Sequence, residues 1–203
     1  MTKSKEKELK KASFIRRLCA FIIDMVLISF AASLIAIPFT NTTAVDSINT
    51  REKELREKYT KQEINSEEYL ITYTDIYYDL NKNTGIASFA SLVLSIVYFV
   101  VFQVYNKGQT LGKKLLGIKI VSDEKELNMN QMIVRSLLAN FILVNILKFA
   151  LLTFTSKSVY VTSSGILEVI NYIIILVSVI MATTKEGRTI HDRIAHTRVV
   201  KAK

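Results

Sequence analysis

The chain is poor in the residue types that carry the most familiar chemistry. Cys19 is the only cysteine among 203 residues, so neither an internal disulfide nor a cysteine-rich metal cluster can form. There are only two histidines and no tryptophan, and one proline and six glycines exclude a low-complexity chain. A zinc site or a catalytic Ser-His-Asp or Cys-His set therefore has little to be built from. We expect no enzyme activity, catalytic residue, metal or cofactor.

What the chain does have is an unusual combination of apolar and basic residues. Half of its residues are hydrophobic, yet its net charge is +9. The two properties occupy alternating blocks, whereas a basic soluble protein mixes them more evenly. This segregation indicates a membrane protein. Nucleic-acid binding would need a basic soluble face with aromatic platforms, and we do not expect it.

Four apolar stretches are candidates for membrane spans. A helix of roughly 20 apolar residues crosses a hydrocarbon core of about 30 Å. Polar residues interrupt the third stretch and the fourth is short, so two or three spans with a re-entrant or surface helix remain an alternative. The predicted spans of this all-α membrane domain, which takes in residues 1–203, are 18–39, 86–105, 132–154 and 166–183.

The basic residues predict the orientation. Residues 1–17 hold seven Lys and Arg, 106–131 hold five and 185–203 hold six, whereas 40–85 holds six against nine acidic residues. With four spans the three basic blocks share one side, which the positive-inside rule makes the cytoplasm. Both termini are then cytoplasmic, and 40–85 is extracytoplasmic. The basic side would also attract anionic lipid.

The 40–85 segment is predicted to be helical. "TREKELREKYTKQE" places acidic and basic residues at helical spacing, and Thr60 with Glu63 fits a capping box for a following turn. A second amphipathic helix follows, with an aromatic stripe that should pack on its partner or lie at the outer interface. The stripe consists of Tyr69, Tyr73 and Tyr77, continued by Leu80.

"KGQTLGKK" (107–114) superficially resembles a phosphate-binding loop. Such a loop needs four residues between its glycines and a Ser or Thr after the lysine, but only three residues separate Gly108 from Gly112, and Lys114 follows Lys113. We interpret Gly108 as a turn, Thr110 as the cap of a short helix and Gly117 as its end. Both lysines would then lie at the lipid headgroups.

Two short segments rich in β-branched residues are too short for helices. "GIKIV" (117–121) and "TRVV" (197–200) are both predicted to be cytoplasmic. We expect them to pair as a two-stranded β-ribbon under the membrane.

"HDRIAH" (191–196) holds both histidines. His191 and His196 are five residues apart with Asp192 between them, which is not the i, i+4 spacing of a helical zinc site.

Three segments in order, "FIRRLCAFIIDMVL", "GQTLGKKLLGIKIV" and "RTIHDRIAHTRVV", resemble the RDD family of small bacterial membrane proteins. The name records one arginine and two aspartates, which by position are Arg17, Asp24 and Asp192. The resemblance covers the frame of the chain, and 40–85 is an insertion. Where the family usually has Ala-Gly-Thr, this chain has His196 in the place of the glycine. The resemblance implies a multi-pass protein of the bacterial plasma membrane that transports an undefined ligand, with cation/proton exchange suggested for some members.

Charged groups within membrane spans are candidate functional sites by default. We expect Asp24 to pair with Arg135, which enters the third span from the same side, and Asp192 to pair with Arg17 at the headgroup boundary. A structural ion pair and a role in ion coupling are both compatible with this pattern. The other candidate residues belong to the two motifs: Gly108, Gln109, Thr110, Gly112, Lys113, Gly117, His191 and Arg193.

Two classes of function follow. The first is an ion- or proton-linked carrier that uses Asp24. The second is a non-transporting membrane module that binds a partner protein or anionic lipid through its basic motifs. Four spans make a thin pathway, so a carrier would have to form a homo-oligomer. A stripe of small residues offers a face for this, at Ala87, Ser91 and Ser95.

Overall fold

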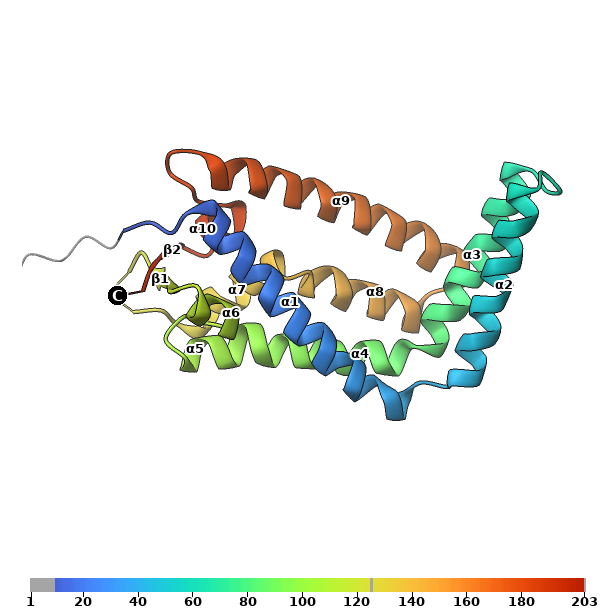
Figure 1. Cartoon of the computed structure of the whole chain (residues 1–203), viewed down its shortest axis with the longest axis horizontal. Helices are drawn as coiled ribbons and strands as arrows, with labels where there is room; N and C mark the ends of the chain where they lie inside the picture. The colour runs from blue at the N-terminus through green and yellow to red at the C-terminus, as the bar shows by residue number, and fades with distance from the viewer. Residues whose placement is uncertain (1–9, 125, 203) are drawn as a thin grey trace, which may run out of the picture. The chain divides into compact units, whose positions relative to one another are not determined.

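The computed structural model describes residues 10–124 and 126–202, and nine residues of the first basic block lie outside these ranges. The described chain is mostly helical, with one small two-stranded sheet, as the sequence predicts. Three helices are long and apolar enough to cross a membrane (Figure 1). They are α1 (Phe14–Ala36) with its 3₁₀ extension η1 (Ile37–Phe39), the α4–η2–α5 helix (Gly85–Ile96, Val97–Phe102 and Gln103–Tyr105), and α9 (Lys157–Thr183).

The third predicted span is broken in two. Helices α7 (Met129–Ala139) and α8 (Ile142–Phe154) meet at an angle of 71°. Phe141, between them, has a φ of +61°, a backbone conformation that cannot continue a right-handed helix. The pair counts as a fourth candidate span only if both halves belong to one crossing.

The fourth predicted span is longer than expected. Helix α9 begins at Lys157 rather than at residue 166, and only Thr155 and Ser156 separate it from α8. The hydroxyl-rich start of α9 lowers its hydropathy, but Tyr160 is only 1% exposed and anchors this turn. Lys148 in α8 donates a hydrogen bond of 2.5 Å to Glu168 in α9, so two of the charges in these apolar stretches bind each other.

The described chain divides into two compact units. The first unit comprises Met1–Phe30, Leu94–Ile142 and Tyr172–Lys203, and the second comprises Ala31–Val93 and Leu143–Asn171.

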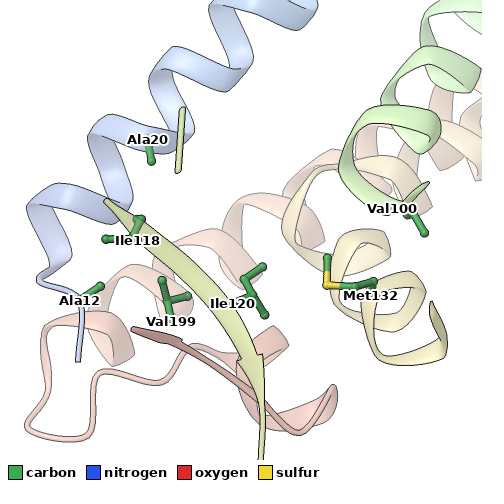
Figure 2. Packing of buried hydrophobic residues seen from close by; sticks show 7 residues of the cluster. All are labelled: Ala12, Ala20, Val100, Ile118, Ile120, Met132 and Val199. Atoms are coloured by element: carbon green, nitrogen blue, oxygen red, sulfur yellow. The ribbon is translucent and has the colours of Figure 1, made fainter. Parts of the chain in front are cut away.

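The first unit contains the predicted ribbon. Strands β1 (Ile118–Ser122) and β2 (Thr197–Lys201) pair in antiparallel register, with Ile120 opposite Val199. The amide of Ala12 donates to the Val199 carbonyl at 3.1 Å, so the segment before α1 lies along the free edge of β2. Alternate residues of the ribbon face the core, which Figure 2 shows around both strands: Ala12, Ala20, Val100, Ile118, Ile120, Met132 and Val199.

Two five-residue helices flank the ribbon. Thr110 caps α6 (Leu111–Leu115) and Gly117 follows it with a φ of +63°, which confirms the expected cap and stop. Thr189 and Asp192 form a capping box around α10 (Ile190–Ile194). His196 adopts a φ of +50°, so the tight turn before β2 forms with histidine in the glycine's place.

The second unit contains the predicted helical insertion. Helices α2 (Thr42–Thr60) and α3 (Ser66–Asn83) pack against each other through Ile48, Leu55 and Ile76. Most of the tyrosine stripe lines this contact, as expected, with Tyr69, Tyr73 and Leu80 packed on those three residues, whereas Tyr77 stacks on Tyr160. The predicted capping box is wrong. Thr60 still belongs to α2 and donates to the Arg56 carbonyl, while Asn65 caps α3.

Candidate functional site

Asp24 is buried in the first unit and accepts hydrogen bonds from uncharged donors. Its carboxylate, 1% exposed, binds the Tyr98 hydroxyl at 2.6 Å, the Thr110 hydroxyl at 2.5 Å and the Gly112 amide at 2.8 Å. Three elements therefore meet at this side chain: α1, the π-helical segment η2 and the start of α6. A buried carboxylate is tolerated when donors replace its lost hydration.

The glycines of the loop motif allow this approach. A Cβ on Gly112 would lie 2.4 Å from the Ala20 carbonyl oxygen and 2.9 Å from Asp24 Oδ1. Gly108 has a φ of +81°, and a Cβ there would lie 2.2 Å from the Ile120 carbonyl oxygen. Gln109 completes the motif by donating to the Ile118 carbonyl at 2.9 Å, which fixes the loop against β1. The motif therefore allows the loop to pack closely between α1 and the β-ribbon.

Asp192, at the start of α10, is fully buried between two arginines. It pairs with Arg135 through Oδ1 and with Arg17 through Oδ2, the latter at 3.4 Å. Thr189 adds its amide and hydroxyl to Oδ2 at 3.1 and 2.9 Å. Burial alone would raise the pKa of Asp192, but the charge of Arg135, together with the hydrogen bonds from Arg135 and Thr189, outweighs burial and holds the pKa well below its usual value.

The predicted pair between Arg17 and Asp192 is therefore present, but the predicted pair between Asp24 and Arg135 is wrong. Arg135 binds Asp192 and the Thr197 hydroxyl, the latter at 3.0 Å. The position of a charged residue along an apolar stretch does not identify the side chains that it faces.

The arginines and Lys113 line one cavity of about 240 Å³ in the first unit. The sequence suggested that Lys113 lies at the lipid headgroups, but its side chain lines this cavity instead. Its ammonium lies 3.5 Å from the Thr110 hydroxyl, and Gln103 accepts from it at 2.9 Å when its amide is oriented to satisfy both ends. Burial lowers the pKa of Lys113 to about 8, although Asp24 acts in the opposite direction.

His191 and Asp192 also line this cavity. Burial, reinforced by the charge of Arg135, lowers the pKa of His191 to about 3, so its imidazole is neutral at pH 7. Arg193, the remaining candidate, points away and binds Glu186 at 2.7 Å on the exposed surface. The cavity thus contains three cations and one carboxylate among its lining residues.

Several residues at the site were not predicted, among them Tyr98 and Ser178. Tyr98 is in an uncharged span and gives no sequence signal, although a polar ring end in an apolar helix needs a partner when buried. Ser178 lines the cavity from α9, and it was not predicted because it also lies in an apolar stretch without a sequence signal.

These features define a helical membrane protein whose apolar helices meet a small ribbon over a cation-lined cavity. The sequence profile of the RDD family matches residues 11–196, nearly the whole chain. The chain belongs to the RDD family, as its Arg17, Asp24 and Asp192 suggested. No curated protein and no solved structure matches it.

Proposed function

We propose that this membrane protein binds a small anion in the cavity of its first unit. The observation that supports this is the excess of positive charge among the lining residues: Arg17, Arg135 and Lys113 against Asp192. Buried cations without matching anions are costly, and an anionic ligand would remove that cost. We place this activity in the bacterial plasma membrane.

A cation site at Asp24 has less support. The carboxylate already accepts three hydrogen bonds, and it does not line the cavity. Cation/proton exchange through Asp24 would require these donors to leave.

Lys113 and Lys114 provide a matched pair of variants for a binding test. Lys113 lines the cavity, whereas its neighbour Lys114 is exposed. Purified protein in nanodiscs of phosphatidylcholine would be titrated with acetate, phosphate and sodium gluconate, with the shift of the thermal unfolding midpoint as readout. We expect acetate or phosphate to raise the unfolding midpoint of wild-type protein and of Lys114→Gln. The affinity of Lys113→Gln for the same anion should be about tenfold lower. Equal responses of the two variants would contradict the proposal.

Transport of the anion is the second candidate, favoured by two irregular helices. The π-helical turn η2 interrupts the α4–α5 helix, and the α7–α8 pair is bent by 71°. Such breaks are frequent where membrane transporters bind their substrates. Liposomes with pH- and ion-sensitive dyes would compare wild-type protein with Lys113→Gln and Asp24→Asn. Anion flux that falls in Lys113→Gln would support a carrier, and binding without flux would identify a non-transporting module.

A further inference from the structure

The cavity of the first unit has a largely apolar lining beside its charged groups. Most of its lining side chains are hydrophobic, contributed by α1, by the residues at the α7–α8 break and by α9. The contribution of α9 follows helical spacing, because Ile174, Ile175, Ser178 and Ala182 recur on one face. A site for inorganic phosphate alone would be expected to be polar on all sides.

Two donors at this cavity have no hydrogen-bond partner among the described residues. They are the hydroxyl of Ser178, a residue that is 8% exposed, and the Nε–H of Arg17. Other hydroxyls of α9 bond to their own helix: Thr183 donates to the Ile180 carbonyl at 2.7 Å and Ser164 to the Val161 carbonyl at 3.1 Å. A buried donor without an acceptor is unfavourable, so an acceptor from outside the chain is expected there.

The charges around the cavity leave one positive charge unbalanced. Arg17 and Arg135 share Asp192, and among the charged groups around Lys113 the carboxylate of Asp24 has the largest effect. Three cations against these two carboxylates leave a single positive charge. The matching ligand charge is therefore −1.

The size of the cavity limits the ligand. A volume of about 240 Å³ corresponds to about eight groups the size of a water molecule, at ~30 Å³ each. A carboxylate with a chain of six to eight carbons is of this order.

We propose that the cavity is a binding site for an amphipathic monoanion, whose acidic head accepts hydrogen bonds from Ser178 and Arg17 while its short apolar chain lies against α9. This deepens the proposed anion binding, on which it depends, by naming the ligand class. Specificity comes from the combination, since a head alone leaves the apolar lining unused and a chain alone leaves the donors unpaired.

Octanoate is the probe. Equilibrium dialysis of radiolabelled octanoate would use protein in phosphatidylcholine nanodiscs, with empty nanodiscs to subtract partition into lipid. n-Octanol has the same chain without the charge, and acetate has the charge without the chain. We expect saturable octanoate binding, with acetate competing about 100-fold less well because each buried methylene adds to affinity.

The variants test the placement. Ser178→Ala removes the unpartnered hydroxyl and should weaken octanoate binding about tenfold. Ser178→Leu places a side chain in the cavity and should abolish it. Ser164→Ala is the matched control, because Ser164 is also buried in the same helix, at 1% exposed against 8% for Ser178, but already has a backbone partner.

The outcomes separate this inference from the proposed function. Binding of acetate equal to that of octanoate would overturn the amphipathic ligand and leave anion binding intact. Failure of every anion to bind would overturn both. Equal competition by n-octanol, or an unchanged affinity for octanoate in folded Ser178→Leu, would show that the carboxylate of octanoate is not recognised in the cavity beside Ser178. If the Ser178 variants do not fold, the comparison of octanoate, octanol and acetate on wild-type protein decides.

Discussion

At the scale of residues, the two buried aspartates of the first unit have different kinds of partner. Asp24 is held by two hydroxyls and an amide, and Asp192 is held by two guanidinium groups and Thr189. The partners of Asp24 are uncharged, and its carboxylate raises the pKa of Lys113 against the larger effect of burial. In the second arrangement, two arginines neutralise the charge of Asp192 in ion pairs. The RDD residues are therefore divided between two clusters, Asp24 with the loop motif and Arg17 with Asp192.

Gly112 makes the first cluster possible, and its replacement tests the packing. The methyl group of Gly112→Ala would collide with the backbone of Ala20 and with Asp24, which cannot yield as a flexible side chain would. We expect a loss of about 1–3 kcal/mol in the free energy of unfolding. Denaturation followed by circular dichroism in detergent would measure it.

Gly165→Ala is the control for this change. Nothing lies within 4 Å of a Cβ at Gly165 in α9, so alanine there should be neutral or slightly stabilising. Equal effects in the two variants would mean that the close approach of α6 to α1 does not determine the result.

His191 should make stability depend on pH. Its pKa is about 3 in the folded protein because of burial and the charge of Arg135; Lys113 and Arg17 act in the same direction, and only Asp192 opposes them. Between about pH 6.5 and pH 3 the unfolded chain binds the extra proton, so this contribution to stability is complete above pH 6.5 and is lost as the pH falls.

We expect a slope of up to about 1 kcal/mol per pH unit between pH 6.5 and 5, since one pKa unit corresponds to about 1.4 kcal/mol and the imidazole is not fully enclosed. His191→Gln should flatten this slope. Thermal unfolding midpoints across that range would measure it. Asp192 loses its own contribution only below about pH 4, so the two groups can be told apart. A variant that kept the full wild-type slope would contradict the assignment to His191.

At the scale of elements, residue type alone predicts the ribbon well. The β-branched residues of "GIKIV" and "TRVV" favour strands over helices, and two short strands on one side of a membrane have few other partners. The paired helices of the insertion follow equally from i, i+4 charges and the tyrosine stripe.

Element boundaries and partners were harder to predict, for physical reasons. The start of α9 was missed because hydropathy measures transfer from water, and a turn rich in hydroxyls satisfies them on its own backbone, as Ser164 does. The partners of Asp24 were missed because Thr110 has a local role, capping α6, that accounted for it fully. Its hydroxyl carries out both tasks.

The register of the ribbon can be tested by a disulfide in a Cys19→Ser background. Val121 and Arg198 are opposite partners away from the core, at a separation suited to a disulfide in antiparallel strands. We expect Val121→Cys with Arg198→Cys to cross-link under mild oxidation, seen as a mobility shift on non-reducing gels. Lys119→Cys with Arg198→Cys is offset by two residues, about 7–8 Å, and should cross-link much less. Comparable yields would indicate a different or sliding register.

At the scale of the whole molecule, the sheet restricts the number of membrane crossings. The segment Lys11–Ala12, β1 and β2 are joined by backbone hydrogen bonds, so all three must lie on the same side of the membrane. Between Ala12 and β1 the chain contains two candidate spans, α1 and the α4–α5 helix, which return it to the starting side.

Between β1 and β2 the chain contains α9 and the bent α7–α8 pair. If α9 alone crossed, β2 would lie on the side opposite β1 and the two strands could not pair. We therefore expect the bent pair to cross as well, which makes four crossings, with the positive-inside rule placing the ribbon and both termini in the cytoplasm.

Single cysteines in the Cys19→Ser background test this at four exposed positions: Gln62, Glu126, Ser156 and Lys185. An impermeant maleimide applied to intact cells should label cysteines at 62 and 156, and those at 126 and 185 should react only after permeabilisation. The position that decides is 156, between α8 and α9, because the alternatives place it differently. If the bent pair were re-entrant, the cysteines at 126 and 156 would both react only after permeabilisation. Helix α9 would then cross to the outside and place position 185 there, away from β1. Since the ribbon cross-link reports pairing independently, protection of 156 together with 126 and 185, combined with an intact cross-link, would show that neither the bent pair nor α9 crosses, and the four-span arrangement would be wrong.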